Sequence, residues 1–273
     1  MLGKLLKQEW KATWKVPTFL VSLVILCSLA AGGSFGLPIW DSDWIGIPIS
    51  ELMVILFLYF VIIGSTLGVM IYMAVRYYKN MFTDEGYLTH TLPAKPWEIL
   101  LSKVINMSIW NLISMAAVLV GMAGFMLFML SFTTPDISFG ELVRMVSKTL
   151  DSAVMRGWQM FAVLMILLFV ISSFSGVMMI VGAVNIGQLV RKHRILGAIG
   201  AYFAIYTVIQ TVGMVVMFPM ILRTVFSLEN MSEISFFEIY NPMYVSMLVV
   251  YLIATIALYF VSEYLLRKKL DLE

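Results

Sequence analysis

Six stretches of this chain contain no Asp, Glu, Lys or Arg. Each is longer than the ~20 residues that an α-helix needs to cross a ~30 Å hydrocarbon core. The chain as a whole is 61% hydrophobic and 12% charged, whereas soluble domains are about 25% charged. The sequence therefore predicts an all-α polytopic membrane protein with six transmembrane helices. The six stretches are Val16–Trp40, Leu52–Val75, Val104–Pro135, Gly157–Val190, Ile195–Leu222 and Ile239–Ser262.

We expect one transmembrane domain over residues 1–273, without a separate soluble domain. Within the apolar stretches, hydropathy favours membrane spans at the following positions: 17–37, 52–75, 104–130, 158–187, 197–222 and 243–263.

The first 15 residues, MLGKLLKQEWKATWK, have an amphipathic pattern. Leu and Trp side chains fall largely on one face of a helix, and the basic residues recur every three or four positions on another: Lys4, Lys7, Lys11 and Lys15. This pattern predicts an interfacial helix over residues 1–15, with lysines toward the lipid headgroups. A ragged beginning of the first span is the alternative.

Basic residues are concentrated in alternate loops. Of the 18 Lys and Arg residues, 14 fall in the N-terminal segment, the second loop, the fourth loop and the C-terminal tail. The positive-inside rule therefore predicts that both termini and these loops are cytoplasmic. Asp41, Asp151 and Glu233 are expected on the outer side.

The second loop, residues 76–103, combines charged and aromatic residues in a short stretch. It is too polar to enter the bilayer and too rich in apolar side chains for an exposed linker. Phe82, Tyr87, Leu88 and Leu92 therefore need a covering surface. That surface is either this protein's own cytoplasmic face or another chain.

Two outer segments have patterns of their own. Residues 132–157 carry apolar side chains at helical spacing after Ser138, which predicts a short external amphipathic helix. Residues 231–243 are acidic and aromatic and end in Asn241-Pro242, which is typical of a turn. We expect a loop there, either on the surface or dipping toward the membrane.

No sequence motif indicates catalysis or cofactor binding. The spans lack a side chain that ionises in the usual range, and His-Glu-x-x-His, Gly-x-Ser-x-Gly and Walker lysine motifs are absent. Cys27 is the single cysteine, so no internal disulfide is possible. We expect no enzyme activity, no bound cofactor or metal, and no nucleic-acid partner. Without a carboxylate at the midplane, any transport would draw its energy from a separate ATPase.

Mild polar residues occur within the spans. Tyr202, Tyr206 and Gln210 are spaced i, i+4, i+8 and share one face of the fifth span. Asn106 and Asn111 lie in the inner half of the third. These five residues either line a pathway or subunit seam, or form hydrogen bonds between helices.

A small-residue motif marks the second span. Gly64 and Gly68 form a Gly-x-x-x-Gly pattern, which predicts close contact with another helix, within the chain or across a dimer.

The second loop also carries three short motifs in succession. They are Asp84-Glu85-Gly86-Tyr87-Leu88, Thr91-Leu92-Pro93 and Leu100-Leu101-Ser102-Lys103. Together with six spans and an amphipathic N-terminus, this succession resembles the membrane subunit of ABC-2 type exporters of Gram-positive bacteria. Relatives often have a hydroxyl residue soon after the Thr-Leu-Pro proline, where this chain has Ala94-Lys95-Pro96. Pro96 is nevertheless well suited to a first helical turn.

The resemblance implies a permease subunit in the bacterial cytoplasmic membrane, surrounded by membrane lipid. Two permease subunits, identical or sister chains, would assemble with two cytoplasmic ATPase subunits that bind ATP and Mg. Residues 76–103 would hold a coupling helix seated in the ATPase. Its contact residues would be Phe82, Asp84, Glu85, Gly86, Tyr87, Leu88, Leu92 and Pro93.

The resemblance favours export of an antimicrobial peptide, a drug or a lipid-like molecule. Two other classes remain open. One is a non-conducting regulatory or immunity subunit associated with an ATPase, and the other is a secondary transporter.

Overall fold

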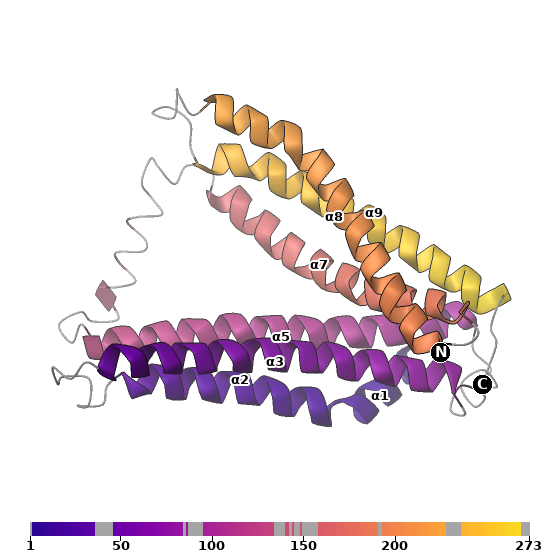
Figure 1. Cartoon of the computed structure of the whole chain (residues 1–273), viewed down its shortest axis with the longest axis horizontal. Helices are drawn as coiled ribbons and strands as arrows, with labels where there is room; N and C mark the ends of the chain where they lie inside the picture. The colour runs from indigo at the N-terminus through magenta and orange to yellow at the C-terminus, as the bar shows by residue number, and fades with distance from the viewer. Residues whose placement is uncertain are drawn as a thin grey trace. The chain divides into compact units, whose positions relative to one another are not determined.

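The computed structural model is almost entirely helical. It describes residues 2–35, 46–83, 86, 95–133, 140–141, 144, 148, 158–190, 193–227 and 236–268. Of these residues 96% are in helices and none is in a β-strand, as the apolar pattern predicts. The long helices are α1 (Leu2–Thr13), α2 (Lys15–Ser34), α3 (Gly46–Phe82), α5 (Pro96–Thr133), α7 (Trp158–Gly187), α8 (Arg194–Ser227) and α9 (Phe236–Lys268), shown in Figure 1.

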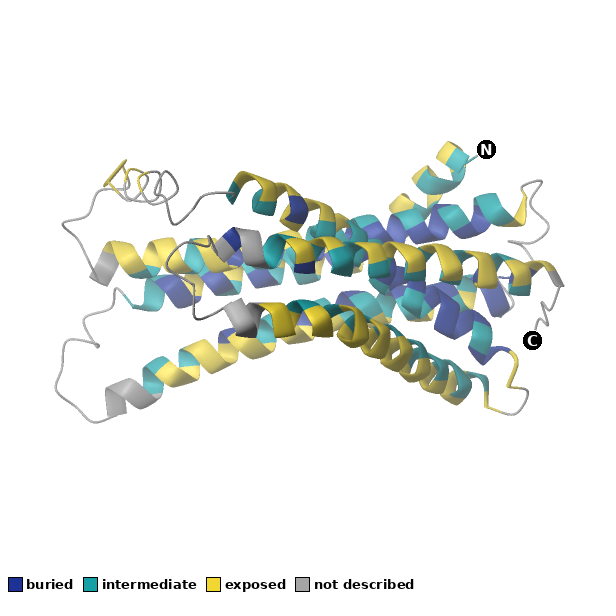
Figure 2. Cartoon of the chain, turned by 90° about the horizontal axis from the view of Figure 1, so that it is seen from above, coloured by how far each residue is buried: buried dark blue, intermediate teal, exposed yellow. Residues whose placement is uncertain are grey.

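Six of these helices, α2, α3, α5, α7, α8 and α9, are long and apolar enough to cross a membrane. Many of their large apolar side chains are exposed (Figure 2). This exposure is expected where the surrounding solvent is lipid, because lipid tails are as apolar as the side chains that they contact. The chain therefore has the architecture of a multi-pass membrane protein.

The chain divides into two compact units. One comprises Met1–Leu6, Ala74–Ser108 and Arg144–Glu273, and the other comprises Lys7–Met73 and Ile109–Val143. The division crosses α3 and α5, so each unit contains part of both helices.

In the unit of Lys7–Met73 and Ile109–Val143, α2 packs against α5 at glycines. A Cβ added to Gly121 would lie 2.7 Å from Ser28 Oγ, and one added to Gly124 would lie 2.9 Å from Leu29 Cδ2. At Gly32 of α2 an added Cβ would lie 2.9 Å from the backbone oxygen of Phe125 in α5. Because a backbone atom cannot turn aside as a side-chain end can, this helix separation requires glycine at position 32.

The same unit holds most of α1 against α5. Trp10 stacks on Trp110 with ring centroids 4.6 Å apart. The Trp110 indole Nε1 donates to Thr13 Oγ1 at 3.3 Å, and Thr13 is only 1% exposed. The expected N-terminal helix is therefore present over Leu2–Thr13, and its C-terminal end packs on this chain. The four lysines of the segment are exposed.

In the other unit, α7, α8 and α9 run beside one another (Figure 1). Phe161 of α7 contacts two α9 rings, Phe237 at 5.0 Å and Tyr244 at 5.1 Å. The apolar window of α7 is 28% buried within the chain, whereas that of α8 is 0% buried and that of α9 is 6% buried. Helix α7 is therefore the most enclosed of the three.

Several helices extend beyond the apolar runs that predicted them. Helix α3 continues past Val75 to Phe82, and α5 begins at Pro96 rather than near 104. The 76–103 loop thus shortens to a connector of residues 83–95. Charged residues end the apolar runs, but Lys and Arg are good helix formers whose stems tolerate apolar surroundings.

The expected loop over 231–243 is wrong for its second half. Helix α9 begins at Phe236 and contains Pro242. Pro242 is the seventh residue of α9, so it lacks an N–H that the carbonyl four residues earlier would accept. Prolines inside membrane helices are tolerated because neighbouring groups satisfy the freed carbonyl. Most of the expected helix within 132–157 lies outside the described residues. The positions that are described there, Gly140, Glu141, Arg144 and Lys148, are helical.

Candidate functional site

A buried hydrogen bond joins α3 to α7. The hydroxyl of Tyr77 donates to Asn185 Oδ1 at 2.9 Å. Tyr77 is 2% exposed and Asn185 is 3% exposed. The other amide atom, Asn185 Nδ2, has no hydrogen-bond partner among the described residues. Interhelical hydrogen bonds of this kind contribute ~0.6–2 kcal/mol in membranes, so the pair fixes the end of α3 against α7.

A second buried contact joins α5 to α7. Ser173 Oγ donates to the backbone carbonyl of Ser108 at 3.1 Å, and both serines are fully buried. We call Tyr77, Asn185, Ser108 and Ser173 the polar seam. It binds α7 to both helices that flank the connector of residues 83–95.

Buried polar side chains continue along the first turns of α5. Ser102, Lys103 and Asn106 are 2%, 5% and 3% exposed. Ser102 Oγ donates to the carbonyl of Ile99 at 2.8 Å. Lys103 was expected in a water-exposed loop. Because α5 already begins at Pro96, Lys103 instead lies within the helix, on its buried face. This end of α5 therefore has a buried face, although Pro96 is exposed and Leu101 and Ile105 are half-buried.

The helix start at Pro96 has its own cap. The Glu98 carboxylate accepts a hydrogen bond from the backbone N–H of Lys95 at 3.1 Å. This is one half of a capping box; Lys95 lacks the hydroxyl that would supply the other half. The expectation that Pro96 opens a helix is confirmed.

Of the eight expected coupling residues, two lie within the described part of the chain. Phe82 is 2% exposed, with its ring centroid 6.3 Å from Tyr77 and 6.2 Å from Tyr78. Gly86 is buried, and its N–H donates to the carbonyl of Thr83 at 2.7 Å. The other six, Asp84, Glu85, Tyr87, Leu88, Leu92 and Pro93, lie outside the described residues.

For Phe82 the covering surface is this chain itself. The sequence left open whether its ring would be covered by the protein's own cytoplasmic face or by a partner. In the structure this chain covers the ring, so Phe82 stabilises the junction of α3 with the connector instead of presenting an exposed ring. A role in contacting another chain then rests on the residues that follow it.

The expected polar face of α8 is present. Tyr202 and Tyr206 stack with ring centroids 6.5 Å apart. Gln210 Nε2 donates to the Tyr206 hydroxyl at 2.9 Å, and the group is exposed. Tyr206 itself is 44% exposed. The alignment of the three side chains is confirmed, and the surface that they contact stays a prediction.

The remaining predicted residues lie on α3 and α5. Asn106 and Asn111 are both buried on α5, with 3% and 8% of their surface exposed. A Cβ added to Gly68 would lie 3.2 Å from Leu20 of α2, whereas one added to Gly64 would meet no described atom within 4 Å. Half of the Gly-x-x-x-Gly motif therefore contacts another helix.

Sequence reasoning missed a close approach of α7 to α8. A Cβ on Gly187, at the end of α7, would lie 2.5 Å from the backbone nitrogen of Ala198 in α8. Small residues on both sides of a short turn, Gly187 and Gly197, were the signal for it.

No protein-family model, no curated protein and no solved structure matches this chain.

Proposed function

We propose that this chain is the permease subunit of an ATP-binding-cassette exporter. Two copies, or this chain and a sister chain, would form the translocation pathway in a bacterial cytoplasmic membrane. A separate cytoplasmic ATPase, which binds ATP and Mg, would drive it through the 83–95 connector. Both termini would be cytoplasmic, with α1 at the membrane surface.

The polar seam is the observation that carries this proposal. The connector is short, and the helices on both sides of it are hydrogen-bonded to α7 through Tyr77–Asn185 and Ser173–Ser108. Interiors packed in this way transmit displacement instead of absorbing it. A push on the connector would therefore move the ends of α3 and α5 together with α7.

The composition of the spans supports transport that is driven by a separate ATPase and not by an ion gradient. The apolar stretches contain no carboxylate that could couple to protons or sodium. The polar side chains in these stretches are uncharged hydroxyls and amides, which suit an amphipathic cargo better than a small ion. A drug, an antimicrobial peptide or a lipid-like molecule fits this chemistry.

The partner contact would be made by the connector residues Tyr87 and Leu88. With Phe82 covered by its own chain, they and Leu92 are the aromatic and aliphatic side chains of the expected coupling residues left to fill a groove in the ATPase, and Tyr87 and Leu88 are adjacent. Central interface side chains of this kind cost ~2–4 kcal/mol when truncated. This loss corresponds to roughly thirtyfold weaker binding or more.

Co-purification tests the proposal. The tagged chain is extracted from the membranes of its own host in mild detergent, and vanadate-sensitive ATP hydrolysis is measured in the eluate. Wild type should retain an ATPase, and Tyr87→Ala/Leu88→Ala should lose it. Leu196→Ala/Phe203→Ala is a matched control, because both side chains are 63% exposed on α8.

Each outcome has a separate meaning. Absence of ATPase from the wild-type eluate would contradict the function. Equal retention by the Tyr87/Leu88 variant would show that the contact lies elsewhere on the chain.

A further inference from the structure

Two buried side-chain amides at the end of α7 each have one atom that is not hydrogen-bonded within the part of the chain that the structure describes. The atoms are Asn185 Nδ2 and Gln188 Oε1. The two side chains are only 3% and 8% exposed. Buried polar groups in proteins are, with few exceptions, paired with protein atoms or with ordered water. Each of these amides therefore has one hydrogen-bonding position that the protein itself leaves to another molecule.

The opposite end of each amide is already engaged. Asn185 Oδ1 accepts from the Tyr77 hydroxyl at 2.9 Å, and Gln188 Nε2 donates to the carbonyl of Val184 at 3.4 Å. Rotating the Asn185 amide by half a turn would place its nitrogen at Tyr77 and leave its oxygen unpaired instead. The same rotation of Gln188 would bring its oxygen against the Val184 carbonyl, where two acceptors repel. Rotation of the amides therefore does not remove the unpaired atoms.

The backbone brings the two amides to one side of the helix end. The N–H of Gln188 bonds to the carbonyl of Val184 at 3.3 Å, so the helical path of α7 continues past Gly187. Residues three apart on a helix have Cβ atoms about 5–6 Å apart. Asn185 Nδ2 and Gln188 Oε1 do not bond to one another directly. A single molecule that is hydrogen-bonded to both, at about 2.8–3.0 Å each, bridges a gap of this size.

The two atoms are a donor and an acceptor, and this combination selects the occupant. The Asn185 N–H needs an acceptor, and Gln188 Oε1 needs a donor. A metal or ammonium cation cannot accept a hydrogen bond, and chloride cannot donate one. Water is the smallest molecule that does both, and buried waters in proteins make about three hydrogen bonds. Basic residues follow at Arg191, Lys192 and Arg194, so this end of α7 lies near the membrane boundary, where bulk water is close.

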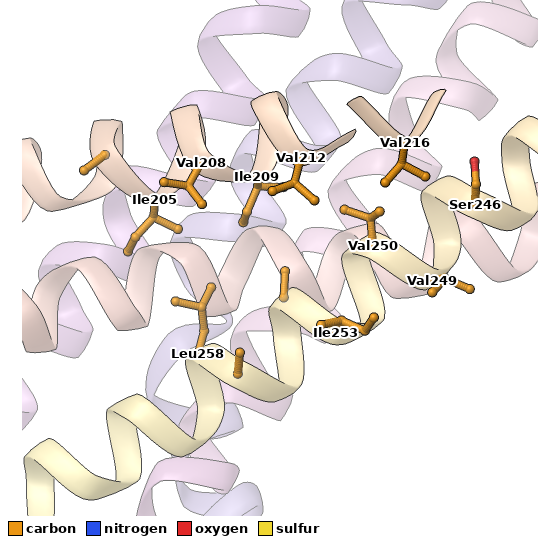
Figure 3. Close-up of a pocket in the computed structure, with 13 residues that line it drawn as sticks. Ile205, Val208, Ile209, Val212, Val216, Ser246, Val249, Val250, Ile253 and Leu258 are labelled. Atoms are coloured by element: carbon orange, nitrogen blue, oxygen red, sulfur yellow. The ribbon is translucent and has the colours of Figure 1, made fainter. Parts of the chain in front are cut away.

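The groove between α8 and α9 has the opposite character (Figure 3). Branched apolar side chains of the two helices line it, among them Val208, Val212 and Ile253. Ser246 supplies the one hydroxyl of the lining, and its Oγ donates to the carbonyl of Met243 at 2.8 Å. Apolar surroundings without polar partners hold no ordered water. A hollow alone therefore does not make a water site, whereas a matched pair of unpaired polar atoms does.

We propose that one ordered water molecule binds between Asn185 and Gln188. It accepts a hydrogen bond from Asn185 Nδ2 and donates one to Gln188 Oε1. The water thus connects the polar seam, through Asn185, to the residue at which the turn into α8 begins. This site is independent of the proposed function, because it needs neither an ATPase nor transport.

Water-edited solid-state NMR tests the site. The full chain, labelled with ¹⁵N-asparagine and ¹⁵N-valine, is placed in phosphatidylcholine vesicles, and magnetisation transfer from water to the Asn185 side-chain nitrogen is measured. That signal is assigned from its loss in Asn185→Leu. The reference for a dry position is the backbone amide of Val181, which is 0% exposed on the same helix. Transfer to Asn185 Nδ2 should be clearly faster than transfer to Val181.

Two substitutions of Gln188 form a matched pair. Gln188→Met keeps the length of the side chain and removes the acceptor, so transfer to Asn185 Nδ2 should fall to the level of Val181. Gln188→Glu keeps an acceptor oxygen and should retain the transfer. Gln210→Met removes the same amide from the exposed face of α8 and should leave the Asn185 signal unchanged.

Three results would overturn the proposal. Transfer to Asn185 Nδ2 that is no faster than transfer to Val181 in the wild-type chain would show that no water binds there. Equal transfer in Gln188→Met and wild type would show that any water present does not bridge to Gln188. Loss of the transfer in Gln188→Glu would show that an acceptor oxygen at this position is not what holds the water.

Discussion

Replacing Tyr77 with Phe tests the polar seam. The change removes one hydroxyl and leaves the ring, so packing against Phe82 is kept. Asn185 Oδ1 then loses its donor at 2.9 Å. Because Asn185 Nδ2 already has no partner among the described residues, neither amide atom would keep one there. Hydrogen bonds between membrane helices average ~0.6 kcal/mol and reach ~1.7, and a fully buried pair belongs to the upper part of that range.

We therefore expect Tyr77→Phe to lower the free energy of unfolding by ~1–2 kcal/mol. The assay is unfolding in SDS–detergent mixtures, followed by tryptophan fluorescence. Tyr206→Phe is the matched control, since its hydroxyl accepts from Gln210 at an exposed site. There the loss should stay within about 0.5 kcal/mol.

A double-mutant cycle isolates the pair. If Tyr77 and Asn185 interact directly, Tyr77→Phe and Asn185→Leu should couple by about 1 kcal/mol, so that the double variant is more stable than the sum of the single effects implies. Strict additivity of the two changes would refute the direct hydrogen bond.

Two further predictions concern packing and topology. Gly187→Ala should destabilise the chain by ~1–3 kcal/mol in the same unfolding assay, because the new Cβ would lie 2.5 Å from the backbone of Ala198. Gly176→Ala, where an added Cβ meets no described atom within 4 Å, should be neutral or slightly stabilising, and equal effects at both glycines would argue against the tight α7–α8 turn. In a Cys27→Ser background, an impermeant maleimide added to intact cells should label Asp43→Cys and Glu233→Cys but not Asp84→Cys. Labelling at position 84 would invert the topology.

The sequence predicted the helices well and their ends less well. Absence of charge over six long stretches leaves few alternatives to membrane-spanning helices, because charged residues at the bilayer centre are costly. The end of α3 at Phe82 was not predictable in this way, since Arg76 and Lys79 interrupt the apolar run without interrupting the helix. At Pro242 the sequence predicted a loop where the structure has a helix, because a proline near the beginning of a helix resembles a turn signal.

The polar seam illustrates a different limit. Tyr77 and Asn185 are separated by 108 residues, and each alone looks like an ordinary polar residue near the end of a span. Their pairing depends on which helices are neighbours and how each is rotated, and a single sequence contains neither. The α8 face was predictable, because Tyr202, Tyr206 and Gln210 lie on one helix and need only its period.

The central claim is that ATP hydrolysis by a partner moves α7 through the connector. The most direct test is double electron–electron resonance, which measures the distance between two spin labels. The labels are attached at Leu26→Cys of α2 and Val170→Cys of α7 in a Cys27→Ser background, and the distance is measured in the co-purified complex. Both positions are exposed, at 65% and 38%. We predict that ATP with vanadate shifts this distance by several ångströms in the wild-type complex. The purified Tyr87→Ala/Leu88→Ala chain, which is expected to lack the ATPase, should show no shift under the same conditions. An unchanged distance in a wild-type complex that hydrolyses ATP would contradict the account and indicate a non-conducting subunit.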